Sequence, residues 1–335
     1  MKYFYCQSYQ VLNLALYNKF VLNNSVTVIT ASENVFKACE YIDIPVLRHR
    51  LFKIRSFFTE IKAVKKEITT ILNIVDNDEL HFSHTQFAVF CFLLIHTMIK
   101  KGERPIFHDF EMVYNSFRKK IPNFREAKLI IQKLLLVVFY EKVPLELRKT
   151  TKKNVMISLN LNFIKENSLV IEYETNQYYE KTLELFGKLN IDYSPFNFLF
   201  VAQNIKIGSH NSKEYNKKVS EIYNLLEQYA FVVKMHPKLG NIGSLSNLET
   251  LPEFLPVEFF FNKVKHAVVS FSSASLVTAS KMGGVSVISL NDLLPNNDDF
   301  TKQAKEKLIS DSEGEIKFVK SIFELKNYLN EKLNA

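Results

Sequence analysis

The chain has 335 residues, of which 47% are hydrophobic and 23% charged, a composition that excludes a disordered protein and leaves room for two domains of ordinary size. Its 43 Lys and Arg residues exceed its 35 Asp and Glu residues and give a net charge of +8, which suits an anionic partner such as a phosphorylated sugar or an acidic membrane surface. The lysines are scattered along the chain and are not grouped with aromatic residues, so a nucleic-acid groove has little support.

The first half of the chain alternates short apolar runs with segments of helical period, which predicts a parallel sheet crossed by helices. We expect helices at 8–20, 34–42, 57–75 and 86–100. The region 144–174 mixes charge with short alternating runs and is expected to form a strand pair or a connection. The expected strands are 2–6, 25–30, 44–49, 79–84 and 104–110.

The second half repeats this alternation after Pro195, so two α/β domains in series are predicted. We place the first domain with its connecting region at 1–190, the second at 191–315, and a C-terminal helix that packs back toward the first domain at 316–335. The elements expected in this half are strands at 192–204, 231–236, 266–271 and 285–290, and helices at 178–191, 212–229, 258–264, 273–283 and 319–333.

The cysteines and the apolar runs indicate a cytoplasmic protein. Cys6, Cys39 and Cys91 lack the spacing of metal ligands and lie within or beside apolar segments, as reduced core residues do. The N-terminus lacks the apolar region of a signal peptide, and the longest apolar run, 87–95, is far short of the ~20 residues that span a bilayer. Peripheral attachment to the inner membrane stays open.

Polar loops follow the strands of the second domain, where parallel sheets bind ligands. His236 ends the strand 231–236, and Pro237, which has no N–H, ends its hydrogen-bond ladder, so the imidazole is expected to face the cleft. Ser272 and Ser273 lie at a strand-to-helix junction, where hydroxyls and free amides can hold a phosphate. A serine at such a place can equally be an ordinary helix cap.

Several short motifs resemble those of the bacterial lipooligosaccharide and capsule sialyltransferases, which are related to the polysialyltransferases. They are "KMHP" at 234–237, "SFSSAS" at 270–275, "LPVEFFF" at 255–261, and the opening "KYFYCQSYQVLNLALYNK". The resemblance implies two facing Rossmann-like domains of the glycosyltransferase-B type with a C-terminal crossing helix. It also implies an inverting transfer of a sialic-type acid from a CMP-sugar to a glycan hydroxyl, with neither a metal nor another cofactor.

The family's acidic motif, two acids followed by a glycine, is matched only in part. The corresponding stretch has Asp109 and Glu111, no glycine, and His108 where one acid would be. The resemblance therefore implies Asp109 as the general base with Glu111 as its alternative, and His236 as the group that donates to the departing phosphate.

The remaining candidate residues follow strands or open helices. On the donor side, Glu258 would hold the ribose hydroxyls, Gln203 and Asn204 would read the cytosine edge, and Lys234 and Pro237 flank His236. On the acceptor side, where a terminal galactoside or sialoside is expected, Gln7, Ser8, Ser83 and His84 would line the subsite. Each of these residues is also explained by ordinary loop or capping chemistry. The other histidines are expected to be structural: His49, His81, His96, His210 and His266.

Alternative functions remain within and outside this class. The same fold could use a CMP-pseudaminic, CMP-legionaminic, CMP-Kdo or hexosyl donor, because few side chains decide the substituents of the donor. A nucleotide-sugar epimerase reuses two facing Rossmann domains without an acceptor site, and a non-catalytic glycan binder is a third reading. The linkage and the oligomeric state, a homodimer included, are open.

Overall fold

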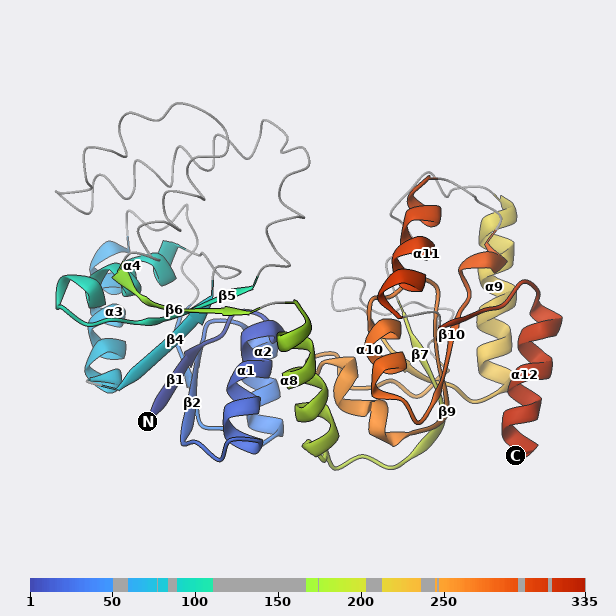
Figure 1. Cartoon of the computed structure of the whole chain (residues 1–335), viewed down its shortest axis with the longest axis horizontal. Helices are drawn as coiled ribbons and strands as arrows, with labels where there is room; N and C mark the ends of the chain where they lie inside the picture. Colours follow the sequence, from blue (N-terminus) through green and yellow to red (C-terminus); the bar gives the residue numbers. More distant parts are fainter. Residues whose placement is uncertain are drawn as a thin grey trace. The chain divides into compact units, whose positions relative to one another are not determined.

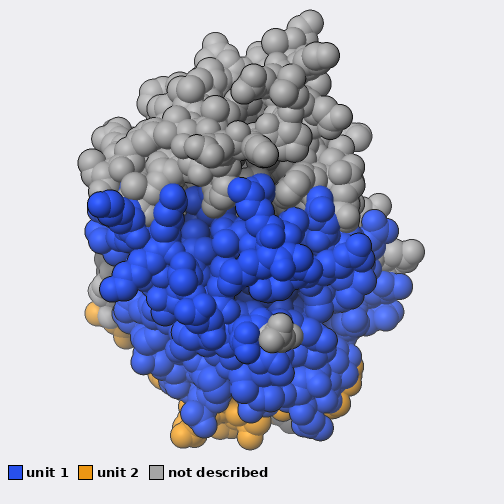
Figure 2. Space-filling view, turned by 90° about the vertical axis from the view of Figure 1, so that its left-hand side faces the viewer, with its two compact units in different colours: residues 1–182 blue, residues 183–335 orange. Residues whose placement is uncertain are grey.

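The computed structural model of the protein describes residues 1–50, 60–76, 78–83, 89–110, 167–173, 175–202, 213–235, 245, 247–294, 299–312 and 315–334. The chain divides into two compact units, Met1–Thr182 and Leu183–Ala335, which Figure 2 draws in blue and orange. Each unit is built around its own parallel sheet, which confirms the predicted fold class (Figure 1). Every helix among the described residues is too short or too polar to cross a bilayer.

The sheet of the first unit has six parallel strands in the order β3-β2-β1-β4-β5-β6. Its central strands are buried along nearly their whole length, as expected of a parallel sheet covered on both faces. The sixth strand comes from the region that the sequence assigned to a strand pair or a connection. The strands are β1 (Lys2–Tyr5), β2 (Val26–Thr30), β3 (Val46–Arg48), β4 (Glu79–Ser83), β5 (Ile106–Phe110) and β6 (Leu169–Tyr173).

Helices cover both faces of this sheet (Figure 1). The pair α3 and α4 packs on the face that carries Tyr5, Phe82 and Phe107, and together they form the apolar core of the unit. The start of α2 is fixed locally, because the Ser32 hydroxyl accepts a hydrogen bond from the Val35 amide at 3.4 Å. The helices are α1 (Tyr9–Phe20), α2 (Glu33–Tyr41), α3 (Ile61–Val75), α4 (Val89–Lys100) and α8 (Thr175–Lys188), which continues past the unit boundary.

Four rings form a ladder across the strands of the first sheet. Phe4 stacks on His81 with 4.3 Å between ring centroids, His81 on His108 at 5.1 Å, and His108 on Tyr173 at 5.6 Å. They come from β1, β4, β5 and β6, so each ring lies beside the next strand's ring. Such cross-strand pairs stabilise a sheet and fix its strand order.

Hydrogen bonds between the polar rings of the ladder have one consistent direction. The Glu79 carboxylate can only accept, so His81 donates to it from Nε2 at 3.2 Å. Burial keeps both imidazoles neutral, because it lowers the pKa of His81 to about 3 and that of His108 well below its usual value. His81 Nδ1 therefore accepts from His108 Nε2 at 2.9 Å, and His108 Nδ1 accepts from the Tyr173 hydroxyl at 3.1 Å.

The sheet of the second unit has five parallel strands in the order β11-β10-β9-β7-β8. Its core is rich in phenylalanine, with Phe198 and Phe200 of β7 packed among residues of β8, β9 and β10. The strands are β7 (Phe196–Val201), β8 (Val232–Lys234), β9 (Val264–Ser270), β10 (Ser286–Ser289) and β11 (Lys317–Phe318).

One α-helix of the second unit departs from the prediction. The C-terminal helix, α12, places Leu325 and Leu329 in the core of the second unit. Its packing toward the first domain stays a prediction. The Tyr229 hydroxyl also donates to Asn330 Oδ1 at 2.7 Å. Helix α11 was not predicted, because its sequence is strongly polar. The helical elements are α9 (Lys213–Gln228), α10 (Ser275–Met282), α11 (Asp299–Asp311), α12 (Ile322–Asn334) and the 3₁₀ helices η5 (Val257–Lys263) and η6 (Asn291–Leu293).

Candidate functional site

In each sheet there is one place where the order of the strands reverses, and this place is where a ligand is expected to bind. Connections leave β1 toward β2 on one side and reach β4 on the other, so the first sheet reverses its order between β1 and β4. The second sheet reverses between β7 and β9. In open parallel sheets, ligands bind outside the carboxyl ends of the strands at such reversals. The loops after these four strands are therefore the places to examine.

In the second unit, Ser272 and Ser273 lie directly after β9 and before α10, at the reversal point, as predicted. Both are half-buried. The Ser273 hydroxyl accepts from the Ser275 amide at 3.3 Å, and its carbonyl accepts from the Leu276 amide at 3.0 Å. Ser273 thus shapes the first turn of α10.

Glu258 in the first turn of η5 lies beside the same helix start. Its Oε1 accepts a hydrogen bond from the Ser275 hydroxyl at 3.1 Å. Loss of water around the carboxyl raises the pKa of Glu258, and this effect is opposed by the Ser275 hydrogen bond and the charge of Lys234. The structure therefore brings Glu258 together with the serine cluster that the sequence assigned to the donor side.

Lys234, the last residue of β8, is buried, with 4% of its surface exposed. Its Nζ donates to the carbonyls of Met235 at 3.3 Å and Glu253 at 3.1 Å. Burial lowers the pKa of Lys234 to about 8, although the charges of Glu253 and Glu258 oppose that shift. The ammonium is thus held by backbone carbonyls.

Buried serines hold the neighbouring strand ends. Ser270, which the sequence placed in the serine cluster, donates to the Val201 carbonyl at 2.7 Å. Ser289 donates to the Phe271 carbonyl at 2.6 Å. These hydroxyls satisfy backbone groups where β7 and β9 end, so they fix the loops and are not available to a ligand.

In the first unit, four candidates lie on three adjacent strand ends. Gln7 and Ser8 follow β1, and Ser8 occupies the N-cap position of α1. Ser83 ends β4 and is fully buried, and Asp109 is the penultimate residue of β5, with 6% of its surface exposed. Because β1, β4 and β5 are neighbours, their carboxyl ends form one edge of the sheet.

A tyrosine and a histidine at this edge were not among the predicted site residues. The Tyr5 hydroxyl lies 3.1 Å from His49 Nε2, and His49 Nδ1 lies 3.1 Å from the Arg50 carbonyl. The carbonyl can only accept, and burial lowers the pKa of His49 to about 4, so Nδ1 carries the proton and Tyr5 donates to Nε2. The pair supports the loop that carries Gln7. In the sequence, only the position of His49 after a short strand hints at it.

The other candidates lie outside the described residues. They are His84 and Glu111 of the first unit, and Gln203, Asn204, His236 and Pro237 of the second. Their assignments stay predictions.

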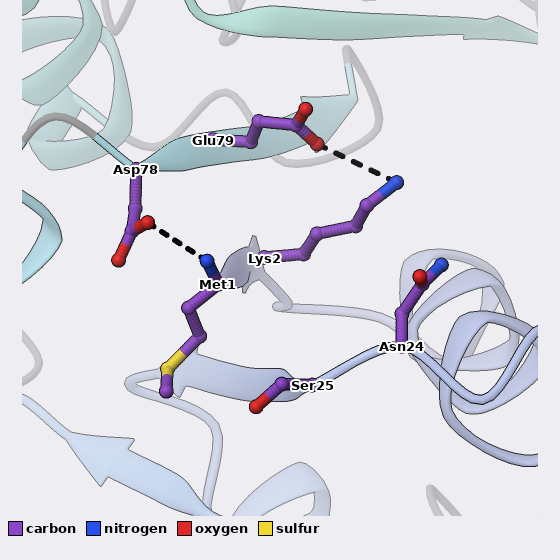
Figure 3. Close-up of a pocket in the computed structure, with 6 residues that line it drawn as sticks. All are labelled: Met1, Lys2, Asn24, Ser25, Asp78 and Glu79. Carbon is purple, nitrogen blue, oxygen red and sulfur yellow. Dashed lines mark hydrogen bonds and ion pairs between the residues drawn. The ribbon is translucent and has the colours of Figure 1, made fainter.

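A polar cavity of about 360 Å³ lies at the opposite edge of the first sheet, where the strands begin (Figure 3). The N-terminal amine of Met1 contacts Asp78 Oδ1 at 2.8 Å, and Lys2 Nζ lies 3.5 Å from Glu79 Oε2. Its charged groups are paired with one another, and none of its residues belongs to the strand ends that the fold assigns to ligands.

Within the described part of the chain, no group of three or more His, Cys, Asp or Glu side chains is arranged to hold a metal ion. The cysteines Cys6, Cys39 and Cys91 are buried and free.

No protein-family model matches the chain, and no curated protein matches it in sequence. Among solved structures, a putative UDP-N-acetylglucosamine 2-epimerase from Listeria monocytogenes has a TM-score of 0.51 at 11% identity, covering 100% of this chain and 88% of that one. An E. coli heptosyltransferase with ADP-2-deoxy-2-fluoro heptose has a TM-score of 0.40 at 13% identity, covering 100% of both chains. At such identities a likeness concerns the fold alone. The two parallel sheets and the likeness to the epimerase agree with the predicted glycosyltransferase-B type of α/β fold.

Proposed function

We propose that this chain is an inverting glycosyltransferase that moves a sialic-type acid from a CMP-sugar to a glycan hydroxyl during lipooligosaccharide or capsule synthesis. The observation that carries the proposal is the polar network at the reversal point of the second sheet, where Glu258 and Ser273 meet through Ser275. A carboxylate beside hydroxyls at a helix start suits a nucleotide, with ribose on the carboxylate and phosphate on the hydroxyls.

The chemistry assigned to the donor side is stabilisation of a leaving phosphate. As the bond to the sugar breaks, negative charge grows on the CMP phosphate, and hydrogen-bond donors fixed in place lower the barrier. Ser272 and Ser273 follow β9 directly, so their positions depend on a buried strand and not on a long loop. The family resemblance adds His236 as the residue that donates to the same phosphate.

The acceptor side needs a base that removes the proton of the attacking hydroxyl. Asp109 is our candidate, because it lies at the carboxyl end of β5 beside the edge formed by Gln7 and Ser83. Glu111 is the alternative. The scheme uses no metal and no further cofactor, and a peripheral position on the inner membrane would bring the enzyme to lipid-linked acceptors.

The direct test is to incubate the protein with CMP-N-acetylneuraminic acid and measure CMP release with and without a galactoside. Release that depends on the acceptor supports the transferase. His236→Ala and Asp109→Ala should each lower turnover by about 100-fold or more while the protein stays folded. Full activity in both variants would refute the roles given to these residues.

A nucleotide-sugar epimerase is the second candidate, favoured by the likeness to the L. monocytogenes structure, whose title names a UDP-N-acetylglucosamine 2-epimerase. It would convert a UDP-sugar without an acceptor. Conversion of UDP-N-acetylglucosamine alone, together with no CMP release, would establish this reading in place of the transferase.

A further inference from the structure

The carboxyl end of β8 contains a charged group that the proposed chemistry does not use directly. Lys234 is buried, and its Nζ spans from the end of its own strand to the Glu253 carbonyl, in the turn that precedes η5. A buried ammonium is costly unless hydrogen bonds and opposite charge compensate it. Two carbonyls supply the hydrogen bonds here, and the carboxylates that act on it are Glu253 and Glu258.

We propose that Lys234 is a positioning residue: its ammonium bonds the end of β8 to the turn before η5 and thereby places Glu258, in the first turn of η5, for the nucleotide. This inference rests on the proposed function, in which Glu258 accepts hydrogen bonds from the ribose. An ionised carboxylate offers only acceptors, whereas a protonated one spends an oxygen on its own proton and accepts less well.

The surroundings of Glu258 have opposite effects on the pKa of its carboxyl. Desolvation raises the pKa of its carboxyl, while the charge of Lys234 and the hydrogen bond from Ser275 lower it. Removal of the Lys234 charge therefore raises the pKa of Glu258 further. Nucleotide affinity should then fall first in acid, where the unassisted carboxyl becomes protonated.

The experiment measures the dissociation constant of CMP by calorimetry from about pH 5.5 to about pH 7.5. The variants are Lys234→Met, Lys234→Arg, Glu258→Gln and the double variant Lys234→Met/Glu258→Gln. The matched control is Lys265→Met, which removes an exposed lysine near the start of β9. We expect Lys234→Met to weaken binding by a larger factor at the acid end than at the neutral end, because removal of the Lys234 charge raises the pKa of Glu258 further. Lys234→Arg, which keeps the positive charge, should bind CMP nearly as well as the unmodified protein at both ends of the pH range.

The double variant separates this role from simple loss of structure. If Lys234 acts through Glu258, adding Lys234→Met to Glu258→Gln changes the affinity by less than about twofold. Equal weakening by Lys234→Met at every pH, or its full effect in the Glu258→Gln background, would overturn the inference.

The failure of the proposed function gives a different result. In that case the unmodified protein does not bind CMP at any pH. The coupling between the two residues is then measured by thermal unfolding of the unmodified protein, Lys234→Met, Glu258→Gln and the double variant. A pH-dependent coupling between the two substitutions would still support the Lys234 and Glu258 pair, and additive effects at every pH would reject it.

Discussion

The buried histidines of the first unit predict a specific sensitivity to acid. His81 lies in the ring ladder with its pKa lowered to about 3, whereas an unfolded chain gives histidine a pKa of about 6.5. As the pH falls below about 6.5, the unfolded state binds a proton that the folded state does not. The stability contributed by the neutral ring is therefore complete above that pH and is lost progressively as the pH falls toward about 3.

The size of the effect follows from these two values. Between about pH 7 and about pH 5, a histidine that stays neutral when folded costs about 2 kcal/mol of unfolding free energy. His49 and His108 are lowered in the same direction. Three such residues give about 6 kcal/mol as an upper limit, comparable to the whole stability of many domains at about 5–15 kcal/mol.

The assay is urea unfolding at both pH values, followed by amide exchange in β1 and β4, with His81→Asn as the test variant. The variant should be less stable at neutral pH, because His108 loses its acceptor and Phe4 its stacking partner. Its loss of stability on acidification should be smaller than that of the unmodified protein by about 2 kcal/mol. The control is His266→Gln, which replaces a half-buried histidine of the second unit. An unchanged acid loss in His81→Asn would show that the ring is not held neutral.

Further predictions follow from single hydrogen bonds. Ser275→Ala removes the donor to Glu258 and should weaken CMP binding by about 2- to 12-fold in calorimetry, while the melting temperature changes little. Ser270→Ala leaves the Val201 carbonyl without its donor and should cost about 1–3 kcal/mol in chemical unfolding, with CMP affinity retained; an affinity loss without destabilisation would contradict that division of roles. Tyr5→Phe removes the donor to His49 and should cost about 1 kcal/mol in the same assay, whereas no change would mean that the bond is not formed in solution.

The sequence predicted the positions of helices and strands better than it predicted which parts of the fold they pack against. Apolar β-branched runs such as 26–30 became strands because a parallel sheet buries both faces of its inner strands. Helix α11 was missed because its polar sequence has little apolar period. Periodicity also shows that a helix such as α12 has an apolar face, but it does not show that this face packs on the core that contains Leu325 and Leu329.

The same limit applies to the site. The sequence correctly placed Ser272 and Ser273 between a strand and a helix, which the structure shows to be β9 and α10. The sequence could not show that Glu258 bonds to Ser275, 17 residues away, or that Lys234 is buried. Those facts depend on how η5, β8 and α10 pack, and local residue patterns do not determine such packing.

The central claim is that the second unit binds cytidine nucleotides at the carboxyl end of its sheet. A thermal-shift comparison of CMP, UDP, GDP and ADP tests it most directly, since a ligand at about 100 times its dissociation constant stabilises the folded state by about 2.7 kcal/mol. We predict that CMP alone raises the melting temperature and that Glu258→Gln with Ser273→Ala abolishes the shift. Selective stabilisation by UDP, or a CMP shift that survives both substitutions, would contradict the account.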